Sequence, residues 1–95
     1  MKILALEKDV VIYKGSDYSN ILAEEAKVVW DLQKQNIIRE IYFRADVKCA
    51  VIILECETTK DAFDMLQKLP LVQKGIIDFD IIPLTTYTGY ERLFK

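Results

Sequence analysis

The sequence predicts a single α+β domain in which four strands and two helices follow one another in the order βαββαβ. Four short segments rich in β-branched and aromatic residues indicate strands, at residues 2–9, 37–44, 49–56 and 76–84. Two segments with apolar residues at helical spacing lie between the first and second strands and between the third and fourth. The chain has 95 residues, so residues 1–95 are expected to form one domain.

The first helix is expected to begin at Ser19 or Asn20, either of which can cap it, and to end near Gln35. Its core-facing stripe is expected to comprise Leu22, Ala26, Val28, Val29 and Leu32. The second helix follows Thr58, which forms a variant capping box with Asp61. The apolar stripe of this second helix is Ala62, Met65, Leu66 and Leu69.

The predicted order of elements is that of the split βαβ, or ferredoxin-like, arrangement. Both helices then cover one face of a four-stranded antiparallel sheet, and the other face is bare in a monomer. Hydrophobic residues make up 52% of the chain, which exceeds the usual 45–50% of soluble domains. The excess favours a subunit interface, so we expect a homodimer or a larger homo-oligomer.

The charge pattern argues against nucleic acid and membrane partners. The net charge is −2, and acidic and basic residues are mixed along the chain, which gives no basic footprint. No apolar run approaches the ~20 residues that span a bilayer. The apolar run near the N-terminus is too short for a signal peptide, so a cytoplasmic location is expected.

The two cysteines are expected to remain free thiols. Cys49 and Cys56 fall on one predicted strand, where seven residues span about 23 Å, too far for a disulfide. Free thiols suit a reducing cytoplasm. The sequence contains no histidine, which excludes Cys/His catalysis and zinc sites with histidine ligands. Neither a cofactor nor a metal ion is expected.

Strand alternation predicts which side chains line the bare face. The expected set is Ile3, Ala5 and Glu7 in the first strand, Ile38, Glu40, Tyr42 and Arg44 in the second, Val51, Ile53 and Glu55 in the third, and Asp78, Asp80 and Ile82 in the fourth. Leu4 and Leu6 are expected to face the helices. The orientation of the third strand follows from a four-residue hairpin loop. Such a loop pairs residue 42 with 51, 40 with 53 and 38 with 55.

Four carboxylates of this set are expected near one end of the bare face: Glu7, Glu40, Glu55 and Asp78. Because crowded carboxylates in an apolar surround cannot all ionise cheaply, at least one should hold its proton to a raised pH. Three interpretations remain open: solvated residues on an open sheet, an oxygen-ligand site for a hard metal, and a proton-transfer or small-ligand site.

Aromatic residues outside the strands have two interpretations. Trp30 is expected in core or interface packing rather than as a stacking platform. Tyr87, Tyr90 and Phe94 lie in the tail after the fourth strand and are either surface residues or anchors on a neighbouring subunit. Anchoring is favoured, because large aromatic groups are costly to leave in water.

Several short motifs occur in an order that resembles the muconolactone delta-isomerase family. These are Leu69-Pro70-Leu71 followed by the acidic-apolar-acidic run from Asp78 to Leu84, and the segments LALEKD, IREIYFRAD, ILEC and DFDIIPL. The resemblance covers nearly the whole chain. It implies a ferredoxin-like fold, sheet-to-sheet pairing into a dimeric α+β barrel, often larger rings, and a cofactor-free isomerase that moves a double bond in an unsaturated lactone acid.

The resemblance also implies site residues. Those at positions similar to the family's arginine and carboxylates are Arg39, Glu55, Asp78 and Asp80. The sequence departs from the family at Glu7, where the isomerase looks basic, and at Glu40, where it has histidine. Two extra acids disfavour an anionic substrate. The resemblance therefore predicts the fold of this chain better than it predicts the substrate.

The residues suggest roles in a proton shift on a small unsaturated lactone or related carbonyl acid. Glu55 is the candidate base, and Glu40 or Glu7 is the neighbour that raises its pKa. Tyr42 is the candidate donor to the developing enolate oxygen. The candidate substrate-binding residues are Arg39, Arg44 and Asp78. The alternatives are a cofactor-free oxygenase and a non-enzymatic small-ligand-binding or assembly module.

Overall fold

The structure is a computed structural model that describes residues 1–94. Its elements, in chain order, are β1 (Lys2–Asp9), α1 (Tyr18–Lys34), β2 (Ile38–Phe43), β3 (Ala50–Glu55), α2 (Thr59–Leu66), α3 (Pro70–Gln73), β4 (Ile77–Pro83) and the 3₁₀ helix η1 (Gly89–Phe94). The predicted βαββαβ order is confirmed, with α3 and η1 as two short additions.

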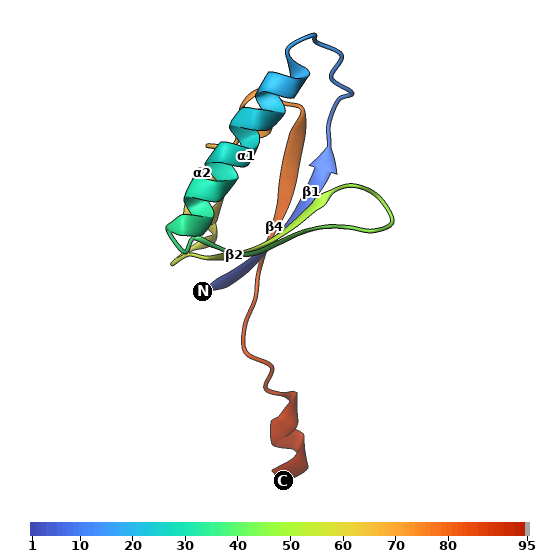
Figure 1. The fold of residues 1–95 in the computed structure, drawn as a ribbon. Coiled ribbons are helices and arrows are strands. Elements are labelled where there is room, and N and C mark those ends of the chain that lie inside the picture. Colours follow the sequence, from blue (N-terminus) through green and yellow to red (C-terminus); the bar gives the residue numbers. More distant parts are fainter. Residues whose placement is uncertain (95) are drawn as a thin grey trace.

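The four strands form one antiparallel sheet in the order β2-β3-β1-β4, with β2 and β4 at the edges (Figure 1). The helices α1 and α2 lie on the same side of this sheet (Figure 1). Buried side chains from both helices and from one face of the sheet form a single hydrophobic cluster. We call this the covered face of the sheet and the opposite one the bare face.

The central strand β3 shows the difference between the two faces most directly. Ala50, Ile52 and Leu54 are buried against the helices, and the alternate residues Val51 and Ile53 are only half-buried. The prediction that Val51 and Ile53 belong to the bare face is therefore confirmed. In β4 the predicted alternation also holds, because Ile77 and Phe79 are buried while Asp78 and Asp80 are exposed.

The predicted orientation of β1 was wrong. Ile3 and Ala5 are fully buried on the covered face, and Leu4 and Leu6 lie on the bare face. The register explains the reversal, because Ala5 is opposite Ile52 on one side and Ile81 on the other. A small residue fits between two large ones beneath the helices, where close packing limits side-chain volume. Glu7 points to the same side as Ile3 and Ala5, so it lies on the covered face and not on the bare face as predicted.

The prediction for Ile38 was wrong as well, because β2 contains an irregularity between Ile38 and Glu40. Ile38 is opposite Leu54 rather than residue 55, and it is buried with the core. A β-bulge of this kind shifts the alternation by one residue. Glu40 and Tyr42 stay on the bare face, opposite Ile53 and Val51 as predicted.

Helix α1 begins earlier than expected, and its predicted stripe is confirmed at Val28, Val29 and Leu32 but was wrong in the first half of the helix. Ile21 is buried in place of Leu22, which is exposed together with Ala26. Trp30 is 59% exposed, so the expectation that it packs in the core of its own chain was wrong. Helix α2 agrees with its prediction, since the Asp61 N–H donates to Thr58 Oγ1 at 3.1 Å.

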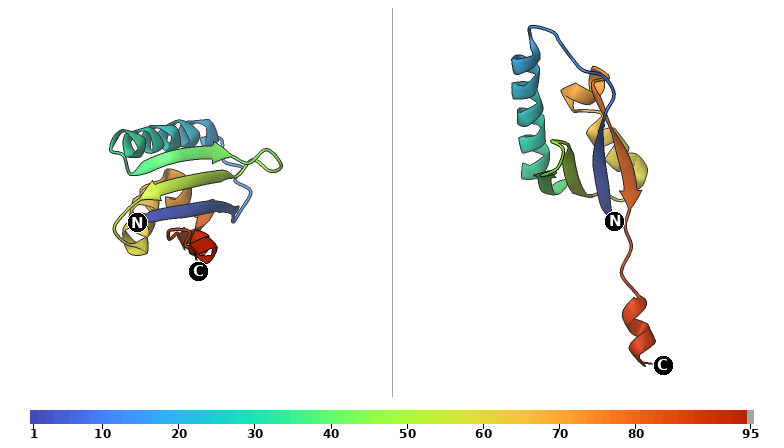
Figure 2. Two further views of the ribbon diagram at one scale, coloured as in Figure 1. Left: turned by 90° about the horizontal axis from the view of Figure 1, so that it is seen from below. Right: turned by 90° about the vertical axis from the view of Figure 1, so that its right-hand side faces the viewer.

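Beyond Pro83 the chain runs away from the sheet as an arm, residues 84–94, that ends in η1 (Figures 1 and 2). The molecule is consequently elongated, with extents of 61 × 29 × 20 Å. Cys49 and Cys56 are free thiols, as predicted. Among the described helices, none combines the length and the apolar character needed to cross a membrane.

Candidate functional site

The bare face has an apolar floor that crosses three strands. Its members are Leu4, Leu6, Val51, Ile53 and Ile82. Leu4 is opposite Ile53 on one side and Ile82 on the other, and Leu6 is opposite Val51, so the floor is continuous. Cross-strand pairs of this kind bring side chains into contact. The floor can therefore support an apolar ligand or the same surface of a second copy.

A tyrosine and a carboxylate stand together beside this floor on β2. The Tyr42 hydroxyl donates to Glu40 Oε1 at 2.8 Å. This hydrogen bond raises the pKa of Tyr42, with a further contribution from the negative charge of Glu40. The phenol consequently remains a proton donor at neutral pH. The two predicted residues thus form one unit that combines a proton acceptor with a hydrogen-bond donor.

Glu55 lies on the bare face, but its surroundings do not suit the predicted base. Its carboxylate is 2.8 Å from the α-ammonium group of Met1. A hydrogen bond from this ammonium group, together with its positive charge, lowers the pKa of Glu55 below its usual range. A base tuned towards neutrality needs a shift in the opposite direction.

The expected cluster of four carboxylates does not form, and this prediction was wrong. Strands β1 and β3 are antiparallel with Lys2 opposite Glu55, so Glu55 lies at the start of β1. Asp78 lies at the other end, opposite Lys8, and its carboxylate accepts the Phe79 N–H at 2.9 Å. The carboxylates therefore divide between the two ends of the sheet.

Glu7 forms a separate group on the covered face at the far end of β1. Its Oε1 accepts the Ala50 N–H at 2.9 Å and so holds the first residue of β3. Burial raises the pKa of Glu7, and the Asp9 carboxylate adds to the effect against the opposing Ala50 hydrogen bond. The pKa of the neighbouring Cys49 thiol is raised by burial and by the charges of Glu7 and Asp9.

Among the described residues, Glu7, Asp9 and Cys49 are the group that could hold a cation. Ligand atoms of Glu7, Asp9 and Cys49 lie within 4.8 Å of one another. Two carboxylates and one thiol mix hard and soft ligands, which is not a set that selects one metal clearly. The raised thiol pKa also opposes the thiolate form that a metal would require.

Both candidate arginines already have partners. The Arg39 Nε–H donates to the Asn36 carbonyl at 2.7 Å, across the turn where Asn36 has a φ of 63°. Arg44 donates to both oxygens of Asp46, at 2.9 and 2.6 Å. A two-bond contact is the geometry by which arginine binds any carboxylate. Arg44 could therefore exchange Asp46 for the carboxylate of a ligand.

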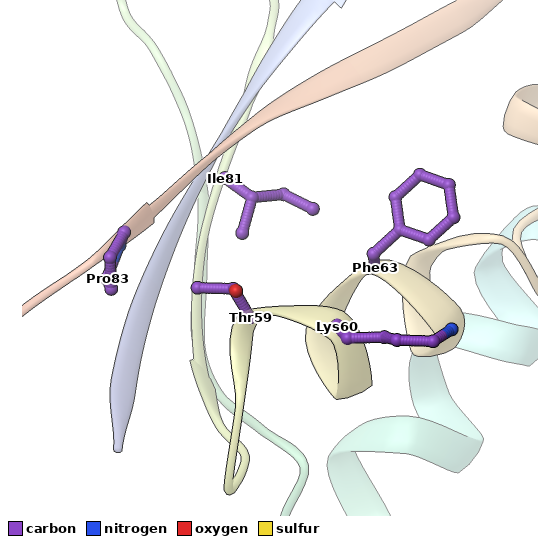
Figure 3. Close-up of a pocket in the computed structure, with 5 residues that line it drawn as sticks. All are labelled: Thr59, Lys60, Phe63, Ile81 and Pro83. Carbon is purple, nitrogen blue, oxygen red and sulfur yellow. The ribbon is translucent and has the colours of Figure 1, made fainter.

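A groove that the sequence analysis did not identify lies between α2 and the edge strand β4 (Figure 3). Its volume is about 620 Å³, and its lining residues are Thr59, Lys60, Phe63, Ile81 and Pro83. Phe63 from α2 and Ile81 from β4 point into the same space in Figure 3. Phe63 lies outside the apolar stripe of its helix and is 47% exposed. That position, visible in the sequence, was the signal that could have revealed the groove.

Comparison with known proteins supports the fold. No protein-family model matches the chain, and no curated protein matches it. A crystal structure of muconolactone isomerase at 3.3 Å resolution is similar, with a TM-score of 0.79, 15% identity, and coverage of 94% of this chain and 93% of that one. The resemblance inferred from the sequence motifs is thus confirmed for the fold.

A second similar structure is 5-chloro-2-hydroxyhydroquinone dehydrochlorinase from Burkholderia phenoliruptrix AC1100 in complex with 2,5-dihydroxybenzoquinone. It has a TM-score of 0.61 and 13% identity, and the match covers 94% of this chain and 98% of that one. Both structures share the α+β architecture described above. The low identities leave the chemistry of this chain to be argued from its own residues.

Proposed function

We propose that two copies of this chain pair through their bare faces and enclose a site for a small unsaturated cyclic ligand. The continuous apolar floor supports this pairing, because Leu4, Ile53 and their neighbours resemble a core that lacks its second half. Pairing two sheets would bury these side chains at the roughly 10 Å spacing of packed sheets. Tyr42 and Glu40 would then line the edge of the enclosed space.

We infer that the enclosed site transfers a proton within its ligand, as an isomerase does. The observation that carries this inference is the 2.8 Å contact between Tyr42 and Glu40 beside the apolar floor. In a carbonyl compound the acidic carbon is bonded directly to the carbonyl carbon. A base and a donor that lie side by side can therefore contact the acidic hydrogen and the carbonyl oxygen at the same time.

The reaction moves one proton and needs no redox partner. Glu40 takes the proton next to the carbonyl, and the electron pair of the broken C–H bond shifts towards the oxygen. Once Glu40 holds that proton, the Tyr42 hydroxyl turns from Glu40 Oε1 to the resulting enolate oxygen and donates its one hydrogen bond there. Glu40 then returns the proton to a different carbon of the conjugated system, which moves the double bond and leaves the atoms of the ligand unchanged in number.

The similar structures support the ligand class. A muconolactone and a chlorinated hydroxyhydroquinone are both small oxygenated rings. Glu40 would repel an anionic ligand, so a less anionic lactone should bind better than a lactone acid. Where a ligand does carry a carboxylate, Arg44 could hold it in place of Asp46, with Arg39 as the second candidate.

The test is exchange of the proton next to the carbonyl into heavy water, followed by NMR for a panel of small unsaturated lactones. Glu40→Gln should slow exchange by roughly 10²-fold, because it keeps the shape and removes the base. Tyr42→Phe should slow it while the fold remains intact. Glu24→Gln, a change at an exposed carboxylate of α1, is the matched control and should exchange at the unaltered rate.

The outcomes separate the candidate bases. Loss of exchange in Glu55→Gln with normal exchange in Glu40→Gln would move the base to Glu55. Loss in Glu7→Gln alone would move the site to the covered face. Absence of exchange with every lactone would remove the enzymatic proposal.

A non-enzymatic ligand-binding or assembly module is the second candidate. Two ion pairs lie on the bare face, the 2.9 Å contact of Lys8 with Asp80 and the 2.8 Å contact of Glu55 with the Met1 α-ammonium group. Such pairing suits a surface that serves assembly rather than chemistry. Chemical-shift changes on adding a lactone, without proton exchange, would support this second function.

A further inference from the structure

Helix α1 carries a second apolar surface on a side that the core does not cover. Leu22 is 42% exposed and Trp30 is 59% exposed, and the exposed Ala26 lies midway between them in the sequence. Residues four apart lie on one side of an α-helix. The side chains that share this side form what we call the outer flank: Ser19, Leu22, Ala23, Ala26, Trp30 and Gln33.

The outer flank contains no charged side chain, although α1 has several. At about 100° per residue the flank occupies a sector of about 100° along roughly four turns. The exposed charged residues of the helix fall outside this sector: Glu24, Lys27, Asp31 and Lys34. Depletion of charge over a contiguous surface with an exposed aromatic ring is typical of the centre of a protein–protein interface.

The position of α1 leaves the outer flank accessible to another molecule. In both views of Figure 2, α1 forms an outer side of the described chain. The bare face lies on the opposite side of the sheet from the helices (Figure 1). One subunit can therefore use the outer flank and the bare face at the same time.

We propose that the outer flank binds the outer flank of a second copy, in an antiparallel pair of α1 helices. The sizes of the side chains support this occupant. In a two-fold antiparallel pair centred beside residue 28, Trp30 of each copy lies opposite Ala26 of the other. The large ring then fills the space above the small residue, and the same contact forms twice. A parallel pair would set Trp30 against Trp30 and leave a gap at Ala26.

The same register suits the residues on either side of this contact. Ala23 lies opposite Gln33, which again sets a small side chain against a larger one. Leu22 lies opposite Lys34, whose aliphatic stem can cover it while the ammonium group stays in water. The antiparallel arrangement also brings the positive end of each helix dipole to the negative end of the other.

The contact is small, so the association is weak and depends on concentration. Leu22, Ala26 and Trp30 form a ridge of residues four apart, and two such ridges pack at a crossing angle of roughly 50°. This angle limits the contact to a few turns around the crossing point. The buried area then falls short of the roughly 1,200–2,000 Å² of stable dimers. The outer flank therefore forms an exchanging contact rather than a permanent one.

Fluorescence of Trp30 tests the proposal directly, because the chain contains a single tryptophan. Indole emission moves to shorter wavelength when the ring leaves water. We expect this movement as the protein concentration rises from about 1 µM to about 1 mM, the range in which weak contacts form. Quenching by acrylamide should weaken by roughly twofold or more over the same range, because an exposed ring becomes covered.

Two matched variants locate the surface that covers Trp30. Ala26→Arg occupies the space opposite Trp30 of the other copy and adds a charge there, so it should remove the shift. Its position is an exposed helical one and arginine is a good helix former, so the circular dichroism spectrum should be retained. Asn20→Arg adds the same charge to the same helix outside the outer flank and should keep the shift.

Three results would overturn the proposal. The first is an emission maximum that stays at the wavelength of a water-exposed indole at every concentration. The second is a shift that persists in Ala26→Arg, because another surface would then cover Trp30. The third is a shift lost equally in Ala26→Arg and Asn20→Arg, because the effect would then not belong to the outer flank.

Cross-linking gives an independent measurement of the orientation. In a Cys49→Ala, Cys56→Ala background, chains with Ala23→Cys are mixed with chains with Gln33→Cys. Mild oxidation at high protein concentration should link unlike chains in preference to like ones, because these two positions face each other only in the antiparallel pair. Preferential linking of Ala23→Cys chains to one another would contradict it.

The outer flank and the bare face can be tested separately. Ile53→Lys should weaken pairing through the bare face and leave the concentration-dependent shift of Trp30 in place. Ala26→Arg should remove the shift and leave pairing through the bare face unchanged in sedimentation at micromolar concentration. Loss of the Trp30 shift in a folded Ile53→Lys chain would mean that the outer flanks do not pair by themselves, against the proposal.

Discussion

The centres of the two sheet faces carry apolar side chains of similar size in very different surroundings. On the covered face, Ile3, Ile52 and Leu54 are at most 1% exposed beneath the helices. On the bare face, Leu4, Leu6 and Ile53 are of comparable size and remain partly open to solvent. Soluble monomers rarely leave a continuous apolar surface uncovered. The comparison indicates that the covered face stabilises the subunit, and the bare face is the surface through which we propose that two copies pair.

The largest effect should come from the covered face. Leu54→Ala removes a fully buried side chain and leaves a cavity, which typically costs about 2–5 kcal/mol. We expect the free energy of unfolding from urea titration to fall by that amount. Ile82→Ala, on the bare face, is the control and should cost clearly less in a monomer. Equal losses would contradict the distinction between the two faces.

The next effect should come from the bare face and should act on assembly. Ile53→Lys places a charge at the centre of the apolar floor, so it should weaken subunit pairing by roughly 100-fold or more. Sedimentation at micromolar concentration should show the shift. Asp31→Lys, on the exposed side of α1, introduces the same side chain away from the interface and should leave the mass unchanged. A wild-type chain that is itself monomeric would remove the basis of the pairing proposal.

A smaller effect should follow from Glu7, at the edge of the covered face. Its pKa lies above the ordinary value of 4.5, so the folded state favours the protonated form. The stabilisation by protonated Glu7 is fully present below the ordinary pKa of 4.5, and it is lost as the pH rises through the raised pKa of the folded state. Glu7→Gln should therefore become more stable relative to wild type as pH rises from 4.5. A stability difference that does not depend on pH would contradict this.

The smallest effect should come from Glu55 on the bare face, because its ion pair is exposed. The pKa of Glu55 is lowered, so its effect on stability depends on pH in the opposite direction from that of Glu7. The stabilisation by Glu55 is present above pH 4.5 and is lost as the pH falls through the lowered pKa. Glu55→Gln should be slightly less stable than wild type at neutral pH and equal to it in acid. Thermal unfolding across pH checks both limits, and Glu57→Gln serves as a neighbouring control.

Much of the fold could be predicted because it depends on local signals. The alternation in β3 and β4, the cap at Thr58 and the order of elements each follow from residues close together in the chain. The pairing of Tyr42 with Val51 followed from the length of one hairpin loop. The two residues of the candidate site, Glu40 and Tyr42, were placed correctly for this reason.

The sequence by itself determined that each strand has two faces, because side chains alternate whatever surrounds them. Only the tertiary structure decided which face of β1 meets the helices, because the packing of Ala5 between Ile52 and Ile81 sets that choice. The bulge after Ile38 and the separation of Glu7 from Glu55 likewise depend on how distant strands pair. Such pairings minimise cavities across the whole core, and no local pattern contains that information.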